Sequence, residues 1–190
     1  MPRVGLTEDL VVDEAERMAD EVGLSRLTLA ALAQRLGVKQ PSLYKHVDGM
    51  PGLQRSIAVR AKGELADTLA RATVGRARDD AIRALSTAYR RWALSHPGRY
   101  AATVHAPEPG DVADQAVSEA VVTVVGDVLV GYDLRDDAAV DAIRALRSAL
   151  HGFVTLESNA GFGLPVDVDR SFDRMVDGLV TALATWNSAA

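Results

Sequence analysis

Amide, hydroxyl, ammonium and imidazole side chains follow one another closely between residues 28 and 46 of this 190-residue chain. The Gln40 amide can donate one hydrogen bond and accept another, which matches the major-groove edge of adenine, and the apolar ring of Pro41 suits a thymine methyl group. The other candidates suit phosphate oxygens or base edges, and they are Thr28, Lys39, Ser42, Tyr44, Lys45 and His46. These residue types indicate contact with double-stranded DNA.

Each of these residues also has a plainer interpretation. Tyr44 could be a half-buried core tyrosine instead of a donor to a phosphate oxygen. Gln40, Ser42 and Lys45 could be ordinary helix surface, and His46 could pack against its neighbours. The choice between the two interpretations depends on the elements that carry these side chains.

Two short helices separated by a tight turn would place these side chains on one surface. The apolar residues of the first helix recur at helical spacing, at Leu29, Leu32, Ala33 and Leu36. Thr28 is a natural N-cap for this helix, and Gly37 can take the left-handed conformation that ends it. A second, short helix starts near Gln40, with Leu43 and Val47 on one of its faces. This arrangement is typical of a DNA-reading helix-turn-helix motif.

Helical patterns continue on both sides of the motif and predict an all-α chain of about nine helices. The further helices are expected at residues 7–22, 49–72, 78–95, 99–105, 112–131, 135–158 and 167–187. Residues 1–50 would form a helix-turn-helix domain, residues 51–72 a connecting helix, and residues 73–190 a separate helical bundle.

The composition excludes several classes of protein. Hydrophobic residues make up 48% of the chain and charged residues 25%, as in ordinary globular proteins. The chain has no cysteine, which excludes disulfides and cysteine-based zinc sites. Its four histidines lack metal-ligand spacing, so no metal is expected. Because no signal peptide is recognisable and no apolar run approaches the roughly 18–20 residues of a membrane span, we expect a cytoplasmic protein without a membrane partner.

The charge of the chain is unevenly distributed. A net charge of −5 argues against binding nucleic acid, but between Val22 and Gly63 seven Lys and Arg residues stand against Asp48 alone, a local balance of +6. A basic patch on an acidic chain is typical of a DNA-binding region joined to a regulatory domain. If a dimer uses this patch, the logarithm of its affinity for DNA should fall against the logarithm of salt concentration with a slope of roughly −5 to −7.

Residues 6–54 resemble the TetR family of transcriptional regulators. The resemblance is carried by Leu27-Thr28-Leu29, Ala33, Leu36-Gly37-Val38, Pro41-Ser42-Leu43-Tyr44 and His46-Val47. It implies an all-α homodimer whose recognition helices enter the major grooves of operator DNA, and which a small molecule releases from that operator. The family often has a lysine where this chain has Met50, so one contact with a backbone phosphate is expected to be missing.

The C-terminal half resembles, more loosely, regulators whose C-terminal domain carries a Trp-His-Gly signature. The matching residues are His96-Pro97-Gly98, Arg99-Tyr100, Leu150-His151-Gly152-Phe153 and Leu156-Glu157, with Leu150 in place of the tryptophan. The resemblance implies that residues 73–190 hold a pocket for an unknown small-molecule effector. The candidate lining residues are Tyr89, Trp92, Tyr100, His105, His151, Phe153 and Phe162, with plain core packing as the alternative for more than half of them.

Catalysis has little support, because the chain contains no Gly-x-Ser-x-Gly elbow, no P-loop and no Gly-x-Gly-x-x-Gly motif. We therefore expect no enzyme activity and no cofactor. Two alternatives stay open: a small helical enzyme, and a regulator-like protein that has lost DNA binding and acts through protein partners. Wide apolar stripes on the last two expected helices predict a homodimer formed through residues 138–187, and hence an operator that is an inverted repeat.

Overall fold

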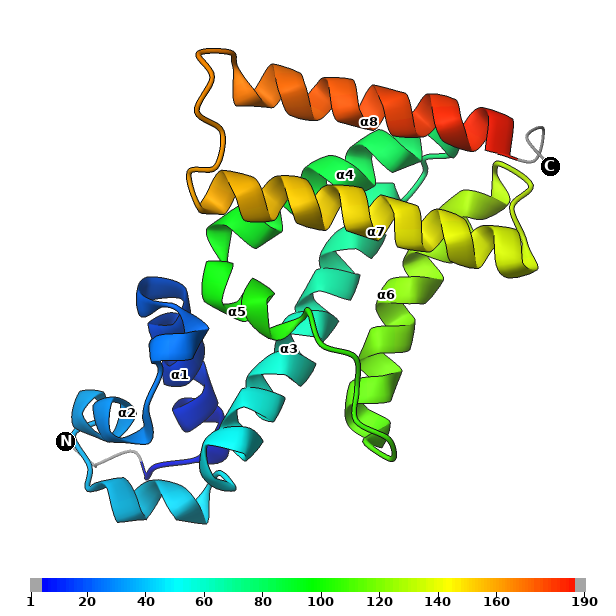
Figure 1. Ribbon diagram of the computed structural model, residues 1–190. Coiled ribbons are helices and arrows are strands. Elements are labelled where there is room, and N and C mark those ends of the chain that lie inside the picture. Colours follow the sequence, from blue (N-terminus) through cyan, green and yellow to red (C-terminus); the bar gives the residue numbers. More distant parts are fainter. Residues whose placement is uncertain (1–4, 187–190) are drawn as a thin grey trace. The chain divides into compact units, whose positions relative to one another are not determined.

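The computed structural model describes residues 5–186, and these residues form helices and connecting loops without a β-strand (Figure 1). The prediction of an all-α fold is confirmed. The α-helices are α1 (Glu8–Val22), α2 (Leu29–Arg35), α3 (Gly49–Thr73), α4 (Arg78–Ser95), α5 (Pro97–Ala102), α6 (Val112–Val130), α7 (Asp136–Ser158) and α8 (Val168–Thr185). Two short 3₁₀-helices, η1 (Leu24–Arg26) and η2 (Gln40–Lys45), complete the described elements. Asn187, the last residue of the expected final helix and dimer segment, lies outside the described residues.

The chain divides into two compact units, each made of two segments. The first unit contains residues 1–63 and 95–118, and the second contains residues 64–94 and 119–190. The long helices α3 and α6 each contribute their N-terminal part to the first unit and their C-terminal part to the second.

The core of the first unit joins α1, α2, η2 and the start of α3. Apolar residues at helical spacing on α3 are buried as the sequence predicts, and Leu53 and Ile57 are fully inaccessible to solvent. They pack in one cluster with Leu32 of α2 and Leu43 of η2, which are also fully buried. This cluster fixes the helix-turn-helix elements on α1 and α3 (Figure 1).

Helix α5 packs against α1 within the same unit, and its limits differ from the expected 99–105. It begins directly after α4 at Pro97, whose missing N–H costs nothing in a first turn. The Asp20 carboxylate of α1 supplies the cap, since it accepts hydrogen bonds from the backbone N–H groups of Gly98 (3.0 Å) and Arg99 (2.9 Å). Because this cap comes from a residue 78 positions away, local patterns could not place the start of α5.

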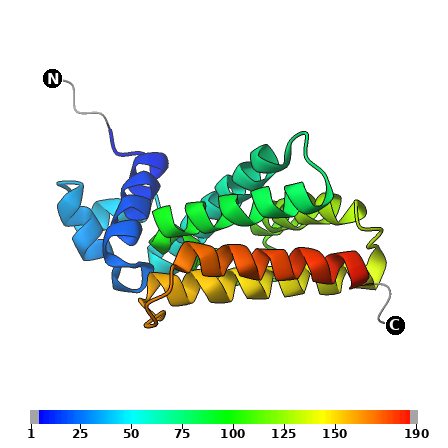
Figure 2. The same cartoon turned by 90° about the horizontal axis from the view of Figure 1, so that it is seen from above.

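In the second unit, α7 and α8 lie side by side and antiparallel, as the two views show (Figures 1 and 2). Arg90 of α4 joins both helices at one end, with its guanidinium 2.6 Å from carboxylate oxygens of Glu157 and Asp169. The hydrogen bonds that Arg90 donates to these carboxylates, first of all to Glu157, raise the pKa of its guanidinium. The same guanidinium lies over the rings of Phe153 and Phe172, which suits a partly desolvated cation.

Candidate nucleic-acid interface

Both ends of α2 are formed by local hydrogen bonds that the sequence specifies. The Thr28 hydroxyl accepts from the backbone N–H of Ala31 at 3.2 Å and so caps α2. At the other end Gly37 has a φ of +66°, and the Val38 N–H reaches the Ala33 carbonyl at 3.0 Å. This is a Schellman-type ending, in which glycine takes the left-handed position without strain. Both helix ends are therefore where the sequence predicts them.

The candidate recognition helix η2 is a single 3₁₀ segment anchored by two apolar residues. Leu43 is fully buried, and Val47 just beyond the helix is 7% exposed. The tight geometry appears in the hydrogen bond from the His46 N–H to the Leu43 carbonyl at 2.8 Å. Because the anchors occupy one face, the side chains of Gln40, Pro41, Tyr44 and Lys45 remain exposed.

The structure brings the expected DNA-contacting residues of η2 onto one accessible surface. Tyr44 is 58% exposed, so the interpretation as a half-buried core tyrosine does not hold. Ser42 and His46 are half-buried, and the exposed candidates are Thr28, Lys39, Gln40, Pro41, Tyr44 and Lys45. Gln40 and Tyr44 also contact each other, since the Gln40 amide nitrogen lies 3.5 Å from the Tyr44 hydroxyl oxygen.

Carboxylates of the first unit neutralise much of the basic patch that the sequence suggested. Four of the seven cations between Val22 and Gly63 are paired with carboxylates of α1, the loop before α6, or α6 itself: Arg35 with Glu14 and Glu21, Arg55 with Asp111, Arg60 with Asp13 and Glu16, and Lys62 with Asp114. Arg26 donates to the Val22 carbonyl. Lys39 and Lys45, on either end of η2, have no ion pair within the described part of the chain, so two unpaired positive charges flank the candidate recognition helix.

Met50, which stands where the resembling family often has a lysine, packs against the apolar cluster of the first unit. It is half-buried at the start of α3. Its side chain therefore serves the core, and it has no group that could bind a phosphate.

The acidic residues that pair with the cations of this unit were not predicted from the sequence. Arg55 and Lys62 lie seven residues apart on α3, and Asp111 and Asp114 lie three apart at the start of α6, so each pair shares one helix face. This spacing was a usable signal that these faces are charged, but it could not identify the partners. The guanidinium of Arg55 and the N–H groups at the start of α6 lower the pKa of Asp111 to about 2.

The residues expected to line an effector pocket are divided between the two units. Tyr100 and His105 belong to the first unit, and the other five belong to the second. Tyr89 and Trp92 are buried on α4, whereas His105 is exposed and His151 is half-buried. Phe153 and Phe162 do meet, with ring centroids 4.8 Å apart, and Phe162 remains 38% exposed.

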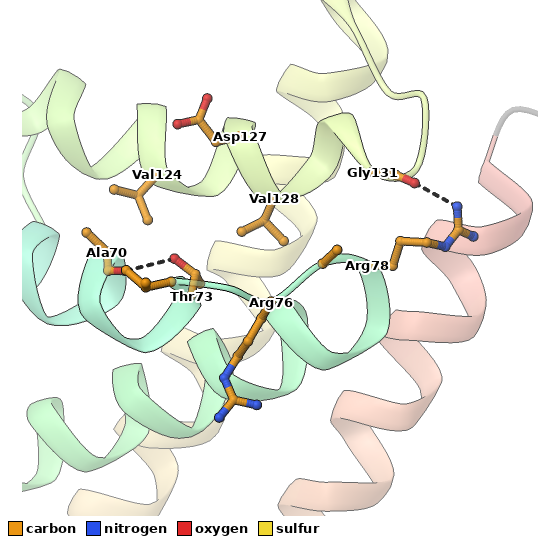
Figure 3. Close-up of a pocket in the computed structure, with 10 residues that line it drawn as sticks. Ala70, Thr73, Arg76, Arg78, Val124, Asp127, Val128 and Gly131 are labelled. Carbon is orange, nitrogen blue, oxygen red and sulfur yellow. Dashed lines mark hydrogen bonds between the residues drawn. The ribbon is translucent and has the colours of Figure 1, made fainter.

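A cavity of about 310 Å³ lies in the second unit, between the end of α3, the start of α4 and the end of α6 (Figure 3). Its lining contains none of the seven expected ligand residues and consists of Ala70, Thr73, Val74, Arg76, Ala77, Arg78, Val124, Asp127, Val128 and Gly131. The Thr73 hydroxyl donates to the Ala70 carbonyl at 3.0 Å, and Arg78 donates to the Gly131 carbonyl at 2.7 Å. These two groups are thus used within the fold, and the rest of the lining combines Arg76 and Asp127 with small apolar side chains.

Among residues 5–186, no group of three His, Asp or Glu side chains is arranged to hold a metal ion. None of the described helices combines the length and the apolar character needed to cross a membrane.

Comparisons with known proteins cover both halves of the chain. A family model described as "Bacterial regulatory proteins, tetR family" matches residues 11–53, and one described as "Tetracyclin repressor-like, C-terminal domain" matches residues 82–179. An uncharacterised HTH-type transcriptional regulator of Bacillus subtilis, YobS, is 34% identical over 98% of this chain and 97% of its own length. A second one, Rv0681 of Mycobacterium tuberculosis, is 40% identical over 90% of this chain and 78% of its own length.

The fold also matches solved structures. A variant of TetR from Acinetobacter baumannii AYE, solved in complex with minocycline, aligns with a TM-score of 0.72 and 22% identity over 94% of this chain and 96% of that one. At this identity the match establishes the fold alone.

Proposed function

We propose, from the premise that this chain belongs to the TetR family of bacterial regulatory proteins, that it is a repressor which a small molecule releases from its operator. Membership of the family makes the chain a ligand-responsive, DNA-binding transcriptional regulator and not an enzyme. The observation that carries the DNA-binding role is η2, whose Leu43 is buried while its polar side chains are exposed. Lys39 and Lys45 at its two ends have no ion pair among residues 5–186. The proposal includes a cytoplasmic location, because bacterial operator DNA lies in the cytoplasm.

The exposed face of η2 supports a division of roles among the candidate residues. Gln40 and Pro41 read base edges, because an amide and an apolar ring match adenine and a thymine methyl group. Tyr44 and Thr28 donate to phosphate oxygens, and Lys39 and Lys45 neutralise phosphates or reach a guanine. Ser42 and His46 are half-buried, which suits shorter contacts at the edge of the interface.

The proposed effector site lies in residues 73–190. The TetR variant solved with minocycline has the same fold, which supports a small-molecule site in this part of the chain. Aromatic pairs such as Phe153 and Phe162 offer stacking surfaces for a planar apolar ligand. The Leu150-His151-Gly152 segment supports placing the chain in the group with a Trp-His-Gly-type C-terminal domain, with leucine in the first position.

The proposed dimer forms through α7 and α8, in residues 138–187. Val140 is 42% exposed, and Ile143 and Leu179 are half-buried, which leaves apolar surface for a partner. Gly152 and Gly178 have open space where a Cβ would be, so a second helix can approach closely. Pairing two such helix hairpins about a two-fold axis gives a four-helix interface and two recognition helices, and therefore an inverted-repeat operator.

A second candidate function is a regulator-like protein that acts through protein partners and has lost DNA binding. It is favoured by the near neutrality of the first unit, whose two segments hold ten Lys and Arg against eleven Asp and Glu. Met50 adds to this argument because it removes one cation.

A gel-shift experiment with the promoter region beside the protein's own gene separates the two functions. The repressor retards this fragment specifically, and a Gln40→Ala, Lys45→Ala double variant does not. That variant keeps the buried Leu43 and Val47 anchors, so we expect it to fold, and its loss of binding would not come from unfolding. Failure of the wild-type protein to retard the fragment, or any unrelated DNA at low salt, supports the second candidate.

A further inference from the structure

Gln40 and Tyr44 are joined by a hydrogen bond on the exposed face of η2. The Gln40 Nε2 donates to the Tyr44 Oη at 3.5 Å, four residues along the chain. Both side chains are exposed, and within residues 5–186 neither has another hydrogen-bond partner. The contact therefore joins two groups that are otherwise free to meet DNA.

The direction of this bond decides which groups remain for DNA. Since the Tyr44 oxygen accepts from Gln40, the tyrosine O–H stays available to donate to a phosphate. Gln40 keeps its second N–H and its carbonyl oxygen. The N–H can donate to N7 of adenine, and the carbonyl oxygen can accept from the N6 amino group. One amide can thus serve the tyrosine and the base together.

The reverse arrangement would separate the two functions. If the Gln40 amide turned by half a rotation, its carbonyl oxygen would need the tyrosine O–H, and the phosphate would lose that donor. A phosphate that accepts from Tyr44 therefore holds the amide in one orientation. An unrestrained glutamine can also direct its N–H groups at the two acceptors of guanine, so it discriminates less well between the purines.

We propose that Tyr44 is a specificity-determining residue, which orients the Gln40 amide for adenine through its hydroxyl oxygen while donating to a phosphate. This inference rests on the proposed function. It makes Tyr44 more than a phosphate contact, because a contact with the backbone alone carries no sequence information. Loss of the hydroxyl then changes base preference as well as affinity.

The test is a selection of binding sites from randomised duplex DNA by the full-length protein and three variants. Gln40→Ala identifies the base pair that Gln40 reads, as the position at which preference is lost. Tyr44→Phe removes only the hydroxyl, and it should relax preference at that same position while weakening binding to all sequences. Lys39→Gln is the matched control, which should weaken binding without changing the preference there.

The size of the effect on specificity comes from titrating the protein into two operators. One is the selected operator, and the other has that base pair changed in one half-site. The net value of one hydrogen bond predicts that Tyr44→Phe lowers the ratio of the two affinities by about 2- to 12-fold. In the Gln40→Ala background the same substitution should leave the ratio unchanged. Thermal melting should be equal for wild type and Tyr44→Phe, since Tyr44 is 58% exposed.

The outcomes separate this inference from the function on which it rests. If Tyr44→Phe weakens binding equally on all sequences and keeps the wild-type preference, the inference is wrong and the regulator stands. The inference is equally wrong if Gln40→Ala loses preference at no position. If the wild-type protein enriches no sequence at all, the proposed function fails.

Discussion

Lys62 of α3 and Asp114 of α6 form a buried ion pair, with 2.6 Å between the ammonium nitrogen and Oδ1. The Lys62 side chain is 5% exposed and the Asp114 side chain 11%. Beside it, the Arg55 guanidinium reaches Asp111 with 2.6 Å between Nη2 and Oδ1. The first turn of α6 is therefore held against the helix that follows the recognition motif, inside the first unit.

Removing one partner of the buried pair should destabilise the protein strongly. Asp114→Ala leaves the Lys62 ammonium buried without a counter-charge, which costs about 3–5 kcal/mol in comparable sites. Replacing both residues by apolar ones, in a Lys62→Met, Asp114→Leu variant, should recover most of this loss. Urea unfolding measures both, and a double variant as unstable as Asp114→Ala would contradict this account.

The Arg55–Asp111 pair should make the stability of the fold depend on pH only under acidic conditions. Because the folded pKa of Asp111 is about 2, below its ordinary value near 3.8, the pair contributes its full stabilisation above about pH 4. This contribution is lost as the pH falls towards 2. The melting temperatures of wild type and Arg55→Gln should therefore differ constantly from pH 5 to 8 and converge below pH 4. A difference that grows as the pH falls below 4 would show that another group is responsible.

Gly98 allows α5 to lie directly against the backbone of α1. A Cβ at this position would lie 2.0 Å from the Ala19 carbonyl oxygen, so Gly98→Ala must displace α5 and should cost about 1–3 kcal/mol or more. Gly126→Ala is the matched control, since Gly126 lies within α6 and a Cβ there meets nothing within 4 Å. It should be neutral or stabilise by up to about 1 kcal/mol. Thermal melting of both variants measures these changes in stability. Equal melting temperatures for Gly98→Ala and Gly126→Ala would contradict the close approach of α5 to α1.

The elements that carry the interface were predictable because their signals are local. Thr28 caps the helix that it precedes and the Gly37 turn ends it, each through hydrogen bonds within five residues, and Leu43 and Val47 mark the next helix by their spacing. The start of α5 was not predictable, because its cap is Asp20. Neither was the pairing of Arg55 with Asp111, 56 positions away. Long-range ion pairs leave no periodic trace in one sequence, and for this reason the +6 patch overstated the free charge.

Burial on α7 and α8 separates residues of the protomer core from candidates for the dimer interface. Leu183 is 3% exposed within one protomer, whereas Leu179 is half-buried with surface to spare. Leu179→Glu should therefore split the dimer while the protomer stays folded, and Leu183→Glu should unfold the protomer itself. Sedimentation and circular dichroism distinguish these results. Val122→Glu on α6, where Val122 is 49% exposed, is the control, and a dimer that only this variant splits would place the interface on α6.

A sequence says least about which residues bind an effector, since an aromatic side chain has the same pattern whether it lines a pocket or fills a core. Tyr89 and Trp92 are buried at the periodic positions that any packed α4 would need. Tyr100 is buried in the first unit, whereas Phe153 and Phe162 pack together in the second. Only the three-dimensional arrangement of the helices separates these cases.

The most direct test of the account is a fluorescence-anisotropy titration of the full-length protein with its operator at several salt concentrations. With Lys39 and Lys45 as the free cations of each η2 in a dimer, the slope of log K against log salt should be roughly −4. Lys45→Gln should reduce its magnitude by about 2, and Arg55→Gln, which removes a cation already paired with Asp111, should leave it unchanged. A slope near zero, or no binding at low salt, would contradict the claim that this chain is a DNA-binding regulator acting through η2.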